Sequence, residues 1–193
     1  MRTPPRSDGD LHGVEAVLAS IRDVREEPPI PFPQLRQVGV EALTSLGWVQ
    51  GTLHLPMHQT LLEFLRLAHD LVKVTRVRLP GEPQPLPFVA IRPEAITLIV
   101  PTLEQALVEP PGHLGMTAPR PVMCLLSQGQ LRGTLDVITG MRLSDQLRQY
   151  GDFMVLRHCL LAPYGETLNS PQARSFTTAV VSLRQAAGVA EDR

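Results

Sequence analysis

His54 and His58 stand four residues apart, a spacing with which two histidines can hold a metal ion on one face of a helix. Pro56 lies between them, at the predicted end of a strand, so we place the pair in a turn. The positions 82 residues further along, Asp136 and Gly140, do not repeat the pair. We therefore expect a solvent-exposed turn here and no bound metal ion.

His158 and Cys159 are a second candidate, because an imidazole can activate a neighbouring thiol as a nucleophile. They are adjacent in a strand-like stretch, and adjacent strand residues point to opposite faces of a sheet. The equivalent positions, Arg76 and Val77, do not repeat the pair, so we expect no catalytic thiol. Cys124 lies in another apolar stretch, and we interpret both cysteines as buried thiols rather than as a disulfide.

Other patterns typical of catalysis are missing from the sequence. There is no glycine-rich phosphate loop, no Gly-x-Ser-x-Gly turn and no Cys-x-x-Cys pair. We therefore predict no enzymatic activity, no catalytic residues, no cofactor and no metal site.

The composition is that of a globular protein that binds no nucleic acid. Of the 193 residues, 43% are hydrophobic, which is enough for a sizeable core. The net charge of -1 and the aromatic content of 4% argue against a basic surface or a base-stacking platform. The N-terminal residues lack the apolar stretch of a secretion signal, and no run approaches the ~18 apolar residues of a membrane span. We expect a cytoplasmic location.

An internal repeat is the strongest feature of the sequence. A shift of 82 positions aligns residues 40–79 with residues 122–161 without a gap, and 12 of the 40 aligned positions are identical. Composition alone would give about 3 identities. The identical positions of the first copy are Val40, Leu43, Ser45, Gly47, Gly51, Thr52, Leu53, Leu61, Leu65, Arg66, Asp70 and Leu79.

Each copy has the pattern of a small β-rich module. Short apolar runs flank a Ser-x-Gly turn and predict a hairpin, leucines at helical spacing follow, and further apolar runs predict strands. The glycine inside the second strand, Gly51 or Gly133, predicts a bulge or a close backbone approach. We therefore predict an α+β fold of two β-β-α-β-β-β modules related by a pseudo-two-fold axis, with an N-terminal amphipathic helix.

The domain boundaries follow from the repeat and from clusters of proline and glycine, of which Pro110-Pro111-Gly112 is the clearest. The predicted organisation is a tail at 1–9, an amphipathic helix and proline-rich arm at 10–37, module 1 at 38–100, a linker at 101–119, module 2 at 120–183, and a tail at 184–193.

Two charged pairs recur in the repeat. Arg66 and Asp70 in the first copy correspond to Arg148 and Asp152 in the second. Each pair has the i, i+4 spacing of a salt bridge at the end of a helix. We predict a structural role for both pairs.

The repeated pattern resembles a small bacterial β-rich module in which a Gly-x-Leu strand precedes a helix that starts Arg-Leu-Ser-Asp-x-Leu. The second copy has this helix start at residues 142–147, and the first copy has the matching closing strands at 87–92 and 96–100. The first copy departs from the helix motif at 60–65, and the second departs from the closing strands. The resemblance covers about two thirds of the chain, implies tandem modules, and carries no assigned activity or site residues.

The N-terminal arm is the predicted partner-binding element. Its apolar stripe has the spacing of an amphipathic helix, and the prolines after it favour an extended conformation. The alternative is that the helix folds back onto its own modules. The candidate partner-binding residues are Leu11, Val14, Val17, Leu18, Ile21, Val24, Pro29, Pro31 and Phe32.

These observations favour a non-enzymatic interaction or assembly protein. We expect an extrinsic, cytoplasmic-side accessory subunit of a larger protein complex, for which a membrane energy-converting or photosynthetic assembly is one setting. The alternative is a small-ligand sensor or regulator that uses the cleft between the two modules. An enzyme and a nucleic-acid-binding protein are the less favoured interpretations.

Overall fold

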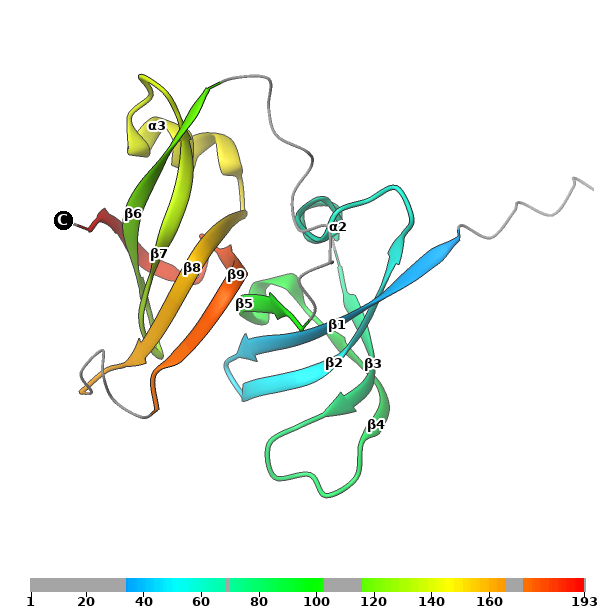
Figure 1. Cartoon of the computed structure of the whole chain (residues 1–193). Helices are drawn as coiled ribbons and strands as arrows, with labels where there is room; N and C mark the ends of the chain where they lie inside the picture. Colours follow the sequence, from blue (N-terminus) through cyan, green and yellow to red (C-terminus); the bar gives the residue numbers. More distant parts are fainter. Residues whose placement is uncertain (1–33, 69, 103–115, 166–171, 193) are drawn as a thin grey trace, which may run out of the picture. The chain divides into compact units, whose positions relative to one another are not determined.

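The computed structural model describes residues 34–68, 70–102, 116–165 and 172–192, which belong to a unit spanning Gln34–Arg193 (Figure 1). The predicted N-terminal helix and proline-rich arm, with all of the candidate partner-binding residues, lie outside the described residues.

The described elements form two series. The first series is β1 (Leu35–Thr44), β2 (Gly47–Pro56), α2 (Leu61–Leu67), β3 (Val72–Arg78), β4 (Leu86–Ile91), a 3-10 turn η1 (Pro93–Ala95) and β5 (Ile96–Pro101). The second series is β6 (Thr117–Leu126), β7 (Gly129–Ile138), α3 (Leu143–Tyr150), β8 (Phe153–Pro163), β9 (Arg174–Ser182) and β10 (Ala186–Glu191). No helix within the described ranges is long and apolar enough to cross a membrane.

The prediction of an α+β fold is wrong, because the described part of the chain is mostly one antiparallel sheet of ten strands with two short helices. The strand order is β10-β6-β7-β8-β9-β5-β1-β2-β3-β4. The two series join where β9 lies beside β5, with Leu98 opposite Val181 and Ile99 opposite Val180 (Figure 1). We call this pairing the junction.

The predicted pseudo-two-fold relation is wrong as well. Within the first series the strand order is β5-β1-β2-β3-β4, and within the second it is β10-β6-β7-β8-β9, so β10 corresponds to β5 and β9 corresponds to β4. A two-fold axis would pair two corresponding edges, such as β5 with β10. The junction instead pairs β5 with β9, so the two series follow one another head to tail.

The glycine inside the second strand of each series does mark a close backbone approach, which confirms the expectation from the sequence. A Cβ atom on Gly51 would lie 2.4 Å from Cγ1 of Val74, and one on Gly133 would lie 3.1 Å from the carbonyl oxygen of Arg157. The register shifts at both places, between Gln50 and Thr52 and between Arg132 and Thr134. Glycine is required because a side chain would push the bulged neighbouring strand away.

Two hydrophobic cores lie along the sheet, and each one contains side chains from both series. Phe153, Val155 and Val180 of the second series pack into the core of the first. Leu43, Leu98 and Val100 of the first series pack into the core of the second. β5 and the C-terminal part of β9 are therefore buried on both faces, which explains their apolar runs.

Candidate functional site

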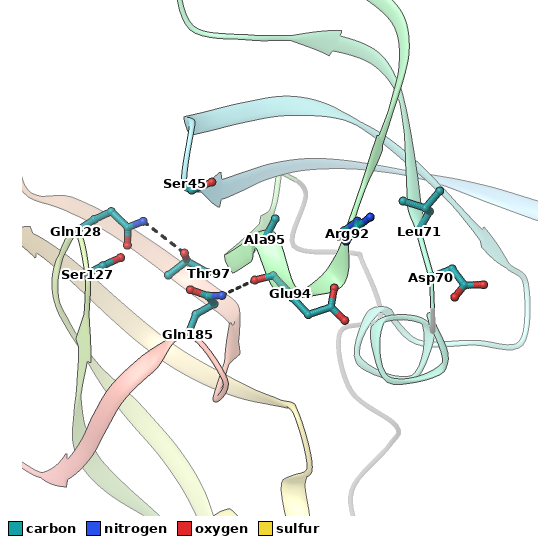
Figure 2. Close-up of a pocket in the computed structure, with 10 residues that line it drawn as sticks. All are labelled: Ser45, Asp70, Leu71, Arg92, Glu94, Ala95, Thr97, Ser127, Gln128 and Gln185. Atoms are coloured by element: carbon teal, nitrogen blue, oxygen red, sulfur yellow. Dashed lines mark hydrogen bonds between the residues drawn. The ribbon is translucent and has the colours of Figure 1, made fainter.

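A polar cavity of about 820 Å³ lies where the turns of the two series meet, beside the junction (Figure 2). The first series contributes its β1–β2 turn, the residues just before β3 and the η1 region, and the second contributes its β6–β7 and β9–β10 turns. Both serines of the repeated Ser-x-Gly turns line the cavity. The lining residues are Ser45, Asp70, Leu71, Arg92, Glu94, Ala95, Thr97, Ser127, Gln128 and Gln185.

Two amide side chains of the second series bind polar groups of the first across this cavity. Nε2 of Gln128 donates to Oγ1 of the buried Thr97 at 3.5 Å, and Nε2 of Gln185 donates to the carbonyl oxygen of Glu94 (Figure 2). Oε1 of Gln128 is buried and has no hydrogen-bond partner among the described residues. A buried acceptor without a hydrogen-bond partner costs free energy.

Charged side chains of both signs line the same cavity. Arg92 supplies a cation, and Asp70 and Glu94 supply carboxylates. Arginine binds carboxylates through its planar fork of donors, whereas carboxylates accept hydrogen bonds from an ammonium group. The cavity therefore suits a small molecule that carries both charges.

A second cluster, centred on Arg174, connects the two series on the surface of the sheet. The guanidinium of Arg174 lies 4.0 Å from the ring centre of Trp48 and 5.4 Å from that of Phe176. Its Nη2 also forms a 2.5 Å ion pair with Oε2 of Glu41. Arg174 and Phe176 come from β9, and the other two residues come from β2 and β1, so the cluster spans the junction. We assign it a structural role.

The recurrent arginines and aspartates do not form the predicted i, i+4 salt bridges. Nη2 of Arg66 instead donates to the carbonyl oxygen of Phe153 at 3.2 Å, which joins α2 to the start of β8. Arg148 lies 3.7 Å from Asp145, and Asp152 pairs with Arg184 at 2.7 Å. Asp70 and Asp152 lie beyond the last residues of their helices, Leu67 and Tyr150, so the i, i+4 spacing does not place them on the same helix face as the arginines.

The two cysteines lie in the core of the second series, and burial raises the pKa of each thiol to about 12. Both are free thiols, as the sequence predicted. A thiol with this pKa is almost wholly protonated at neutral pH and is a poor nucleophile. The neighbouring His158 is exposed.

The histidine pair predicted to lie in a turn is split between two elements. His54 lies in β2, and its Nε2 lies 2.8 Å from Oγ1 of Thr75 on β3. His58 lies in the turn that follows β2. Among the described residues, no group of three or more metal-binding side chains gathers in one place.

The residues that line the cavity were not among the sites predicted from the sequence. Ser45 and Ser127 were found as a matched pair of turn residues, and that match was a signal that both turns have the same form. Arg92, Glu94 and Gln185 come from positions outside the aligned segments, so the repeat could not identify them. Their meeting depends on the head-to-tail order of the two series.

Comparison of this chain with family models, with curated proteins and with solved structures gives no match.

Proposed function

We propose that this chain is a non-catalytic assembly protein that binds protein partners through the two outer edges of its sheet. One observation carries the proposal. In the described part of the chain, β4 pairs only with β3 and β10 pairs only with β6, so each has an outer edge of backbone donors and acceptors without a strand beside it.

An unpaired sheet edge is a template for another strand, because its backbone groups can continue the ladder of hydrogen bonds. The edge formed by β4 also has large apolar side chains near it. Phe88 is 57% exposed and Leu71 is 56% exposed. Covering a large apolar side chain contributes roughly 1.5–3 kcal/mol, which favours a protein partner at this edge.

The proposal retains the cytoplasmic location and the role of accessory subunit in a larger complex, such as a membrane energy-converting or photosynthetic assembly. It adds the sheet edges to the N-terminal arm as candidate binding elements.

The test is purification of the full chain, with an N-terminal affinity tag, from the cells that make it. We expect a stable species larger than the single chain of 21.3 kDa. The variant Phe88→Asp should lose this species, because an aspartate beside the edge must be desolvated on binding. Met57→Asp is the matched control, since Met57 is 57% exposed in the turn that follows β2, and β2 is not an edge strand. Elution of the tagged wild-type chain by itself would contradict the proposal.

A second candidate function is the sensing of a small ligand in the cavity beside the junction. Arg92, together with the carboxylates of Asp70 and Glu94, favours a zwitterion such as a free amino acid. Thermal unfolding in the presence of each free amino acid tests this candidate. A ligand present at 100 times its Kd would add about 2.7 kcal/mol to the free energy of unfolding. Arg92→Ala should abolish the shift, and the absence of any shift across the set would contradict the candidate.

A further inference from the structure

We propose that the partner at the sheet edges is a second copy of this chain, whose β10 pairs with β4 of the first copy and thereby repeats the internal junction. The inference rests on the proposed function, because it names the occupant of the same edges. Four structural correspondences carry it.

The first correspondence is between β10 and β5. In the first series, Glu41 lies opposite Val100 and Ala42 lies opposite Ile99. In the second series, β6 and β10 have the same register, with each β10 residue 90 positions after its β5 counterpart. The register shift near the end of the pairing also recurs at the equivalent place. β10 therefore has the place in the second series that β5 has at the junction.

The second correspondence is between β4 and β9. Val72 lies opposite Ile91 in the first series, and Met154 lies opposite Val181 in the second. Each β4 residue corresponds to the β9 residue 90 positions later in the sequence. This offset holds at every position where β4 is paired with β3 and β9 is paired with β8 in the same way. The free edge of β4 is therefore the counterpart of the edge with which β9 meets β5.

These two correspondences fix the expected register between copies. At the junction, Leu98 lies opposite Val181, and the same pairing between copies places Gly188 opposite Ile91. Likewise, the pairing of Ile99 with Val180 becomes a pairing of Val189 with Ala90.

The third correspondence is an apolar side chain that is buried in one series and exposed in the other. Phe153 is 3% exposed because it packs into the core of the other series. Its counterpart at the free edge, Leu71, is 56% exposed. A second copy placed by the junction geometry would cover Leu71 in the same way.

The fourth correspondence explains the recurrent arginine. Arg66 donates to the carbonyl oxygen of Phe153 and so binds the two series together. The side chain of its counterpart Arg148 is 83% exposed, and its one ion pair within the described ranges is a 3.7 Å contact with Asp145. In the proposed pairing, Arg148 of the second copy donates to the carbonyl oxygen of Leu71.

The association between copies is weaker than the internal junction. Gly188 stands where β5 has Leu98, and Lys73 stands where β8 has Val155. Smaller or charged side chains bury less apolar surface, and lysine near an edge opposes sheet extension. The species is therefore expected to depend on concentration. Because each copy has one edge of each kind, the pairing produces either a closed ring or an open filament.

Sedimentation velocity of the purified full chain over a range of concentrations tests the association. We expect the average mass to rise with concentration, and we expect Arg148→Ala to raise the Kd about tenfold, because a hydrogen bond from a charged group is lost. Arg142→Ala is the control, since Arg142 precedes the same helix without a side-chain cap. A monomer at every concentration, or an Arg148→Ala variant that associates like the wild type, would overturn the inference.

Disulfide formation between separately prepared variants tests the register. Val189→Cys mixed with Ala90→Cys should cross-link under mild oxidation, because residues directly opposite in an antiparallel pair have Cβ atoms about 4.5–5.5 Å apart. The two native cysteines are buried and remain unreactive. Val189→Cys mixed with Met57→Cys is the control and should not cross-link, because Met57 follows β2, which is not an edge strand. Equal yields for the two mixtures would refute the register.

The two proposals fail in different ways. If the purified chain is a monomer but is recovered from its own cells in a complex that Phe88→Asp removes, then the second copy is the wrong occupant and the assembly role stands. If neither species forms, both proposals are overturned.

Discussion

Replacement of Phe153 by alanine is expected to destabilise the whole sheet, although this residue belongs to the second series and fills the core of the first. The side chain is 3% exposed in that core, alongside Val155 and Val180. Truncation of a buried phenylalanine costs about 3–5 kcal/mol in the free energy of unfolding, through lost burial and the cavity left behind. For a chain of this size the Tm should fall by roughly 6–20 °C.

The matched control is Leu71→Ala, which truncates the equivalent position of the first series. Leu71 is 56% exposed, so the free energy of unfolding should change by only about 0.5 kcal/mol. Both variants are measured by far-ultraviolet circular dichroism during heating, at a dilution where the chain is a monomer. We expect one cooperative transition in each case. Equal Tm values for Phe153→Ala and the wild type would refute the packing of the two series against each other.

The remaining predictions concern local features. Gly51→Ala should lower the free energy of unfolding by about 1–3 kcal/mol, because the new Cβ would lie 2.4 Å from Val74 Cγ1. Gly133→Ala, whose new Cβ would lie 3.1 Å from its nearest contact, should lower the free energy of unfolding less, and urea unfolding measures both variants. Thr60→Ala should cost about 1 kcal/mol at neutral pH, because it removes a capping box. The hydrogen bonds from Thr60, first from its backbone N–H and then from its side chain, hold the pKa of Glu63 below its ordinary value of 4.5. A lowered carboxyl pKa stabilises the folded state above pH 4.5, and this stabilisation is lost as the pH falls through the folded-state pKa. The difference in the free energy of unfolding between the wild type and Thr60→Ala should therefore become smaller in acid. Both native thiols should resist a thiol reagent at pH 8 and react fully in denaturant, because burial raises the pKa of each to about 12; rapid labelling of the folded chain would contradict this.

The sequence was informative where structure depends on neighbours along the chain. The repeat identified both hairpins, and the close backbone approach at Gly51 followed from the residue type alone. The arrangement of the two series was not predictable in this way, because the pairing of Leu98 with Val181 joins residues far apart in the chain. A continuous apolar run such as 96–100 indicates burial on both faces of a strand, but it does not identify the neighbouring strand.

The candidate site was harder to predict than the strands. Polar residues in turns are common, and nothing local distinguishes Gln128 or Gln185 from other surface amides. Their position at the cavity depends on the head-to-tail order. The recurrence of Arg66 and Arg148 was visible, but the sequence-based explanation was wrong, because the carbonyl oxygen that Arg66 binds belongs to the other series. β10 gave little signal, since alanine and glycine have low strand propensity.

The sharing of core side chains between the two series has a consequence for synthesis on the ribosome. When Pro101 has just been made, the first five strands exist as sequence, but their core still lacks Phe153, Val155 and Val180. The edge of β5 is also without its neighbour until β9 has been translated. At the usual ~5–20 residues per second, this leaves several seconds in which an apolar strand edge is open to other nascent chains. Such a polypeptide is expected to complete its fold only when β9 has been made.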